Sequence, residues 1–209
     1  KRGRFMEIVF VRHGQTDLNR SGCIQGSSTN EILNGVGREE AEKAGSNFNS
    51  KKFDVIYSSP LKRALETAEI FTHDRNDIII DDRLKEIDFG EWDGQPVAKI
   101  EKKYPDAIDS WGQVGQSYIK YAPNGETFEE LNQRCGQFLR DMADRYPNSK
   151  ILVFCHGTLI RMMAAHYLTN GNMNNFETIR NCALVKFNYH NRSPRMVYYN
   201  KVLYELTKE

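Results

Sequence analysis

The sequence lacks any long hydrophobic run. Its longest apolar stretches are short segments such as residues 8–11 and 78–80, whereas a membrane-spanning helix needs about 20 consecutive apolar residues. The basic residues 1–4 are not followed by the apolar segment of a secretory signal peptide. We therefore expect no membrane association, no export and a cytoplasmic location.

The sequence also has no excess of charge of either sign. It contains 29 Lys and Arg residues against 28 Asp and Glu residues, which gives a formal net charge of +1. A chain so balanced has no global field that attracts nucleic acid or anionic lipid. We expect neither partner, and any basic residue that matters must act locally.

Cysteine is scarce and lacks paired spacing. Cys23, Cys135, Cys155 and Cys182 are widely spread and form no CxxC motif. A domain of this size does not depend on disulfides to close its core. We interpret all four as reduced thiols.

Linkers, internal repeats and low-complexity segments are absent as well. The chain has 209 residues, of which 39% are hydrophobic and 27% charged, the usual balance of a folded globular protein. Domains mostly contain about 100–200 residues. We therefore predict a single domain over residues 1–209.

What is present is an alternation of strand and helix patterns. Short apolar runs rich in β-branched and aromatic residues predict buried strands, and apolar residues at helical spacing predict helices. Strands are expected at residues 7–12, 54–57, 78–80 and 150–155, helices at about 35–48, 60–71, 128–142 and 159–168, and edge strands at 183–189 and 196–206. This alternation predicts an α/β fold, which we expect to be a three-layer α/β/α sandwich with a mostly parallel central sheet.

Polar residues are placed to begin several of these helices. Asn34 precedes the first predicted helix, and Thr127 with Glu130 forms a capping box. Ser59 followed by Pro60 is interpreted as a capping hydroxyl with proline at the first helical position.

Cationic and imidazole side chains stand at strand ends or helix starts in three places. Arg12 and His13 follow the first strand, His156 follows the most apolar strand, and Arg63 lies in the first turn of a predicted helix. In open α/β sheets, ligands bind at the carboxyl ends of the strands. A cation near a helix N-terminus opposes the helix dipole unless it serves an anion there.

Each of these residues alone has an ordinary interpretation. A histidine at a strand end is usually structural, and an arginine usually forms a surface ion pair. Together, however, two His-Gly pairs and two arginines in one crevice would repel one another without an anionic guest. We therefore predict an anion site, and we interpret His73, His166 and His190 as structural or surface residues.

A phosphoryl group suits such a site. Guanidinium groups match phosphate oxygens in pairs, and phosphoryl transfer needs mainly positioning and neutralisation of charge. A neutral imidazole, with a usual pKa of about 6.5, can itself be the nucleophile. The leaving oxygen needs a proton donor, for which the chain offers Glu86, Asp88 and Glu91.

Four blocks in this order resemble the histidine phosphatase superfamily, also called the phosphoglycerate mutase-like family. Residues 12–16 read RHGQT, residues 58–64 SSPLKRA, residues 84–94 LKEIDFGEWDG and residues 154–157 FCHG. The resemblance covers nearly the whole chain, about residues 6–189. It implies an enzyme that needs no metal and no other cofactor, and the absence of a cluster of Cys and His ligands agrees.

The resemblance also implies roles for individual residues. His13 would be the nucleophile that becomes phosphohistidine, and Glu86 would protonate the leaving group and later activate water. The phosphate would be surrounded by Arg12, Asn19, Arg63 and His156, and the entrance would be lined by Gln25, Gly26, Gly157 and Thr158.

The block around Glu86 favours hydrolysis over phosphate shuttling. It ends in FGEWDG, as in the phosphatase branch, whereas mutases carry a Tyr-Gly-Gly-Leu-type segment and a longer insertion behind it. The loop between residues 26 and 37 is one residue longer than the family's usual form, and Asn30 stands where aspartate is common. We predict a phosphomonoesterase that acts on small phosphorylated metabolites.

Residues 104–125 are aromatic but aperiodic, and a loop of that length is more often a lid or binding loop than idle. In this fold the loop would overhang the site. Trp111, Tyr118, Lys120 and Tyr121 would then either select the remainder of the substrate or pack the loop onto its own domain.

Two other functions remain open. A phosphoglycerate mutase would use the same residues, and an inactive protein could keep the pocket only to bind a phosphorylated ligand. The presence of the full set of site residues argues against the second. The sequence names neither the substrate nor the oligomeric state, although an exposed strand edge in the tail could pair with a second copy.

Overall fold

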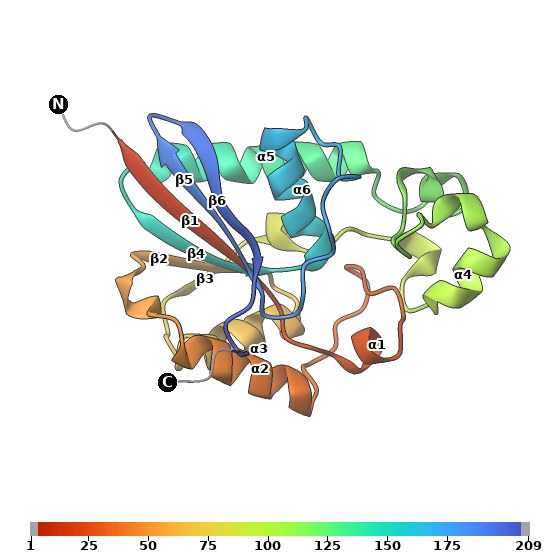
Figure 1. The fold of residues 1–209 in the computed structure, drawn as a ribbon, viewed down its shortest axis with the longest axis horizontal. Helices are drawn as coiled ribbons and strands as arrows, with labels where there is room; N and C mark the ends of the chain where they lie inside the picture. The colour runs from red at the N-terminus through yellow and green to blue at the C-terminus, as the bar shows by residue number, and fades with distance from the viewer. Residues whose placement is uncertain (1–3, 206–209) are drawn as a thin grey trace.

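The computed structural model describes residues 4–205, and its centre is a six-stranded sheet (Figure 1). The strand order is β3-β2-β4-β1-β5-β6. The strands are β1 (Phe5–Arg12), β2 (Val55–Ser58), β3 (Ile78–Ile80), β4 (Lys150–Cys155), β5 (Leu184–His190) and β6 (Ser193–Lys201). The expected strands are therefore all present, although the last one begins earlier than predicted and ends at Lys201; Leu206, its predicted end, lies outside the described residues.

The four strands on one side of the sheet are parallel, and the last two are antiparallel. β4 pairs in parallel with both β1 and β2, and β2 pairs in parallel with β3. β5 and β6 form an antiparallel hairpin beside β1. Asn191 and Arg192, which connect the two, have φ angles of 49° and 69°, as a two-residue hairpin turn of the favoured hand requires.

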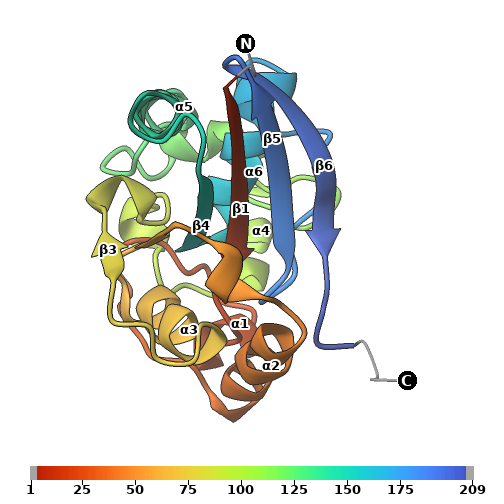
Figure 2. The ribbon, with the colours of Figure 1, turned by 90° about the vertical axis from the view of Figure 1, so that its left-hand side faces the viewer.

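Helices cover both faces of this sheet. α2 (Gly35–Ser46) and α3 (Lys62–Phe71) lie on one face, and α5 (Phe128–Arg145) and α6 (Gly157–Leu168) lie on the other (Figures 1 and 2). Successive residues of a strand point to opposite faces. Accordingly, Val9 packs in the core of α2 and α3, whereas Phe10 packs in the core of α5 and α6. The predicted three-layer α/β/α fold is confirmed.

Shorter helices lie in the connections. α1 (Asp17–Arg20) and α4 (Val97–Lys103) are single short α-helical segments. The 3₁₀ turns are Ser50–Lys52, Asp82–Leu84, Gly90–Trp92, Pro105–Ala107 and Gln116–Lys120.

Two of the predicted helix starts are confirmed. The Asn34 side chain accepts the N–H of Gly37, and Thr127 forms a complete capping box with Glu130. The third is wrong, because α3 begins at Lys62 and Ser59 does not cap it. Instead, the Oδ1 atom of Asn30 accepts the N–H of Lys62 at 2.8 Å, so the cap comes from a distant loop.

Residues 104–125 form a compact segment rather than an open lid. Tyr118 is fully buried, and its hydroxyl donates to the backbone oxygens of Asp88 and Glu126. The ring of Tyr121 stacks on Tyr104 at 4.3 Å between centroids. The packing interpretation is therefore correct for these two residues, whereas Trp111 is 83% exposed.

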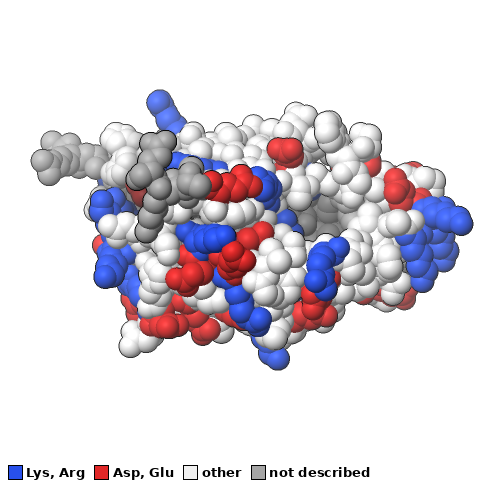
Figure 3. Space-filling model, turned by 60° about the horizontal axis from the view of Figure 1, so that its bottom comes forward, with Lys and Arg blue, Asp and Glu red and all other residues white. Residues whose placement is uncertain are grey.

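The surface carries both signs of charge. Lys and Arg side chains alternate with Asp and Glu side chains over the face drawn in Figure 3, in keeping with the net charge of +1. None of the helices within residues 4–205 has the length and apolar character to cross a bilayer. The four cysteines of this region are free thiols.

Candidate active site

The predicted site residues converge because their strands are neighbours. β4 lies between β1 and β2, and all three run in the same direction. Their carboxyl ends are joined by backbone hydrogen bonds, from His13 to Cys155 at 3.0 Å and from Ser59 to Phe154 at 2.9 Å. Residues that follow these strands therefore meet at one edge of the sheet, as ligand sites of open α/β sheets do.

The two imidazoles face each other at this edge. The ring centroids of His13 and His156 are 5.2 Å apart. Nδ1 of His13 lies 2.8 Å from the carbonyl oxygen of Gly14. Because a carbonyl oxygen only accepts hydrogen bonds, Nδ1 carries the proton and Nε2 keeps a free lone pair.

Both imidazoles are neutral at physiological pH. Burial lowers the pKa of His13 well below its usual value, and the charges of Arg63 and Arg12 lower it further. The pKa of His156 is lowered well below its usual value for the same reasons, again chiefly by burial. A neutral imidazole is the form that can attack phosphorus.

Arg12 and Arg63 place buried positive charge beside the imidazoles. Arg63 is fully buried and donates to the carbonyl oxygens of Thr29 at 2.6 Å and Gly26 at 2.9 Å. Burial lowers the pKa of Arg63 to about 10, which leaves it charged at pH 7. Arg12 donates to the carbonyl oxygen of Ile179.

Neither arginine has an anionic partner among the residues that the structure describes. The ion pairs among residues 4–205 include neither Arg12 nor Arg63. The Nε atoms of both are buried without a hydrogen-bond partner in that region, as is Nδ1 of His156. A buried cation without a counterion is costly, so this arrangement favours the binding of an anion.

Glu86 is the one of the three candidate carboxylates that lines the pocket. Its oxygens accept backbone N–H groups from Ile87 at 3.0 Å, Thr158 at 2.9 Å and Leu159 at 3.0 Å. The N-terminus of α6 therefore binds this carboxylate. Asp88 instead accepts the N–H of Gly90, and Glu91 is exposed.

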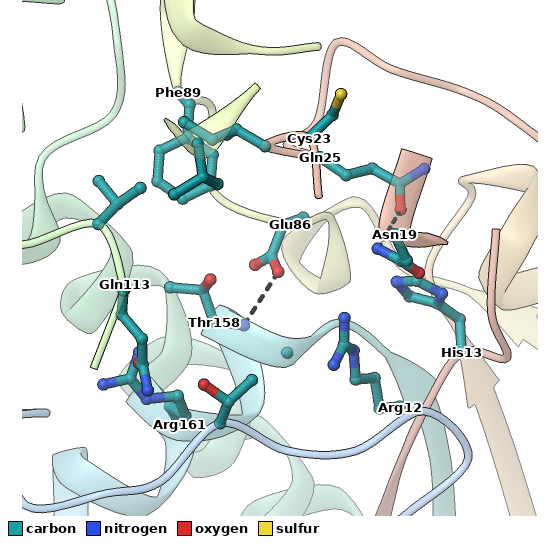
Figure 4. A pocket seen from close by; sticks show the side chains of 16 residues that line it. Arg12, His13, Asn19, Cys23, Gln25, Glu86, Phe89, Gln113, Thr158 and Arg161 are labelled. Carbon is teal, nitrogen blue, oxygen red and sulfur yellow. Dashed lines mark hydrogen bonds between the residues drawn. The ribbon is translucent and has the colours of Figure 1, made fainter. Parts of the chain in front are cut away.

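A cavity of about 210 Å³ opens in front of these groups (Figure 4). Seven of the predicted site residues line it, namely Arg12, His13, Asn19, Gln25, Glu86, Gly157 and Thr158. Arg63 and His156 are fully buried behind the lining. Gly26 also lies outside the lining. It packs closely against Ile87, whose carbonyl oxygen would lie 2.6 Å from a Cβ added at this glycine.

Asn19 and Gln25 are held by a polar network. The Oε1 atom of Gln25 accepts from Thr16 and from Asn19, each at 3.0 Å. Asn181 donates to the backbone oxygen of His13 at 2.9 Å and to Asn19 at 3.3 Å. The Nε2 group of Gln25 is buried without a partner among the described residues and can donate to a ligand.

Several residues of the site were not predicted. Thr67 accepts the N–H of Gly14 at 3.0 Å and donates to the carbonyl oxygen of Arg63 at 2.6 Å, which ties two parts of the site together. Thr67 lies three residues after the SSPLKRA block, on the same helix as Arg63, so a signal existed. Asn181 and Arg161 had none, because they stand in segments whose pattern is otherwise irregular or purely helical.

Side chains of the kinds that bind metal ions are not clustered in the described part of the chain. Within residues 4–205 there is no cluster of three or more His, Cys, Asp or Glu side chains arranged to hold a metal ion.

Comparison with known proteins decides the family. The model of the histidine phosphatase superfamily, branch 1, matches residues 8–202. The chain belongs to this superfamily. The resemblance inferred from the four sequence blocks is confirmed, and the protein is an enzyme of the histidine phosphatase type.

Its relatives within the superfamily include named phosphatases. The chain is 36% identical to the uncharacterized phosphatase PhoE of Bacillus subtilis, over 75% of this chain and 74% of the relative. It is 31% identical to phosphoserine phosphatase 1 of Hydrogenobacter thermophilus, over 76% and 74%. A solved structure of phosphoserine phosphatase from Entamoeba histolytica in complex with 3-phosphoglyceric acid superimposes with a TM-score of 0.79, at 25% identity, over 96% of this chain and 100% of the other.

Proposed function

We propose that this enzyme hydrolyses small phosphomonoesters through a phosphohistidine at His13, without a metal ion. One observation carries the proposal. The neutral His13 ring keeps its Nε2 lone pair free because Nδ1 donates to Gly14, and it lies beside half-buried Arg12 and buried Arg63, which have no ion-pair partner among the described residues. Such a site binds a phosphate dianion and offers it a nucleophile.

The first step transfers the phosphoryl group to the protein. Nε2 of His13 forms a bond to phosphorus while the ester P–O bond breaks, and Glu86 gives a proton to the departing oxygen. Arg12, Arg63 and Nδ1–H of His156 neutralise the charge on the phosphoryl oxygens. The second pKa of a phosphate monoester is about 6, so a substrate can arrive as the monoanion. It then gives its proton to Glu86, which leaves the dianion bound, and Glu86 passes the proton to the departing oxygen.

The second step releases phosphate. Water attacks phosphorus, Glu86 accepts a proton from it, and the N–P bond breaks, which returns His13 to its free form. The pocket is compatible with this sequence because the Glu86 carboxylate lines the same cavity as His13.

The substrate class follows from size and from the relatives. A cavity of about 210 Å³ accommodates a phosphoryl group with a small alcohol portion. Relatives are named for phosphoserine, and one neighbour was solved with 3-phosphoglyceric acid. We therefore expect small phosphorylated metabolites rather than macromolecules.

Replacing His13 with Ala tests the nucleophile. We expect kcat for an aryl phosphate to fall by at least about 1,000-fold, whereas EDTA leaves the wild-type rate unchanged. His166→Ala is the matched control, because this half-buried histidine bonds Asn132 and does not line the cavity. An active His13→Ala variant would contradict the assignment.

Two further measurements separate the rival functions. With 3-phosphoglycerate, a phosphatase releases inorganic phosphate, whereas a mutase produces the positional isomer. Acid-labile, base-stable labelling from a phosphoryl donor distinguishes an enzyme from a binding protein, because only the enzyme forms the N–P bond.

A further inference from the structure

Another arginine, Arg161, lines the same cavity, and phosphate binding does not account for it. Arg161 is only 8% exposed. Its Nε atom donates to the carbonyl oxygen of Phe176 at 3.1 Å and its Nη2 atom to that of Met173 at 3.2 Å. Its Nη1 atom has no hydrogen bond to any residue within 4–205.

Arg161 also lacks a negative partner in the described part of the chain. No carboxylate oxygen of residues 4–205 lies within 4.0 Å of its guanidinium group. Arg134, a comparably enclosed arginine, pairs with Glu126 at 2.7 Å. Carbonyl oxygens satisfy the N–H groups of Arg161 but do not neutralise its charge, and an unpaired buried charge is costly.

The arginine stands at the end of the cavity opposite to the phosphate site. Figure 4 shows Arg161 beside Gln113 at one end and Arg12 with His13 at the other, with Glu86 between the two ends. Thr158, whose N–H binds Glu86, precedes Arg161 by three positions on α6. The two residues therefore share a face of the helix, about 4.5 Å apart along its axis.

The surroundings of Arg161 indicate what it binds. Oε1 of Gln113 is buried without a hydrogen-bond partner in the described region. The nearby carboxylate of Asp109 is already engaged, because it accepts the N–H groups of Trp111 and Gln113, each at 2.9 Å. The other wall of the cavity is largely apolar, formed by Ile24, Phe89, Val97 and Val114.

We propose that Arg161 is a specificity-determining residue that binds a carboxylate on the alcohol portion of the substrate. The inference rests on the proposed phosphatase function and deepens it, because it makes the substrates phosphate esters of short carboxylic acids. A second phosphate group fits less well, because a phosphate dianion is best held by paired guanidinium N–H groups, and Arg161 has only its Nη1 group free. The free Nη1 group matches a singly charged carboxylate.

The test compares two substrates that differ only in this group. D-3-phosphoglycerate and sn-glycerol 3-phosphate share a three-carbon skeleton, and only the first carries a carboxylate. We expect wild-type kcat/KM to be at least about 10-fold higher for phosphoglycerate, because a hydrogen bond to a charged group contributes this much or more. In Arg161→Gln, kcat/KM for phosphoglycerate should fall by about 10- to 100-fold, mainly through KM, while the value for glycerol 3-phosphate stays within about 3-fold.

Two controls accompany this comparison. Arg195→Gln makes the same change of charge on the exposed edge strand β6 and should alter neither substrate. A second measurement uses the wild type alone, in case Arg161→Gln does not fold. D-glycerate should inhibit hydrolysis of an aryl phosphate competitively, whereas glycerol at the same concentration should not.

The outcomes distinguish this inference from the function on which it rests. If Arg161→Gln affects both substrates equally, or neither, Arg161 only holds the segment of Met173 and Phe176, and the inference is wrong although the phosphatase stands. Equal inhibition by glycerate and glycerol, or none by either, would overturn it in the same way. If the wild type hydrolyses no phosphate ester at all, the proposed function itself fails.

Discussion

Ser59 determines which nitrogen of His156 carries the proton. Its Oγ atom accepts the N–H of Leu61 at 3.3 Å and lies 2.8 Å from Nε2 of His156. The hydroxyl hydrogen has no other acceptor within the described residues, so it is donated to Nε2. Nδ1 of His156 then carries the proton, and it is this nitrogen that is buried without a partner.

Replacing Ser59 with Ala should therefore change the tautomer of His156 rather than only the packing. We expect kcat to fall by about 10-fold, because Nδ1 ceases to be a dedicated donor to the phosphoryl oxygens. The ¹⁵N shifts of the imidazole should show that the proton of His156 moves toward Nε2 in the variant.

Ser58→Ala is the matched control for this measurement. Ser58 is equally buried, but its hydroxyl donates only to the backbone oxygen of Ser59 at 2.9 Å. A Ser59→Ala variant with full kcat and an unchanged ¹⁵N spectrum would refute the positioning role.

At the scale of elements, the start of α2 packs closely against the loop that carries His13. A Cβ added at Gly37 would lie 2.2 Å from the backbone oxygen of Gln15, and one added at Gly14 would lie 2.5 Å from that of Gly37. In both cases the added Cβ would meet a backbone atom, which cannot move aside as the end of a flexible side chain can. The absence of a side chain here allows the helix to hold the loop in place.

Gly37→Ala should accordingly destabilise the protein by about 2 kcal/mol or more and lower its activity, because the loop after β1 is displaced. Gly35 in the same helix has no atom within 4 Å of an added Cβ, so Gly35→Ala should be neutral or stabilise by up to about 1 kcal/mol. Urea unfolding and aryl phosphate turnover measure both effects. Similar losses in the two variants would rule out the close backbone approach as the cause.

The elements differ in how far the sequence could predict them. β3 and β4 were predicted to the residue, because each is a continuous apolar run that is local in sequence. For β4 this run reflects burial on both faces of the sheet. The start of α3 was wrong, because its capping group belongs to Asn30, which only the folded chain brings near Lys62. No pattern in the sequence next to Lys62 predicts such a cap.

The same distinction applies to the site. Arg12, His13 and His156 directly follow or end strands of the parallel part of the sheet, so their convergence could be predicted from it. Glu86 was singled out from three carboxylates only by the resemblance to the family. Arg161 lies in a segment for which the sequence predicts a helix and nothing more. Its importance depends on the lack of a carboxylate around it, which is a property of the three-dimensional packing.

At the scale of the whole molecule, the buried imidazoles make stability depend on pH. Burial lowers the pKa of both His13 and His156 well below about 6.5, their value in the unfolded chain. Below pH 6.5 the unfolded chain therefore binds more protons than the native protein, and the free energy of unfolding falls as the pH falls. The loss should reach about 1.4 kcal/mol per pH unit for each histidine.

Urea unfolding between pH 7.5 and 5 measures this slope. A His13→Gln, His156→Gln double variant should lose most of it, while a small part remains because burial also lowers the pKa of His166. Parallel slopes for the double variant and the wild type would show that the two imidazoles are not responsible.

The place of β4 in the sheet has a consequence for biosynthesis. This strand separates β1 from β2, yet the ribosome makes it long after both. A nascent chain that has emerged only through α5 already contains His13, Arg63 and Glu86. It still lacks β4, which pairs with both β1 and β2, and it lacks the amides of Thr158 and Leu159 that bind Glu86. We therefore expect no hydrolysis by the growing polypeptide until β4 and the first turn of α6 have been translated, so that activity reports the insertion of β4 between β1 and β2.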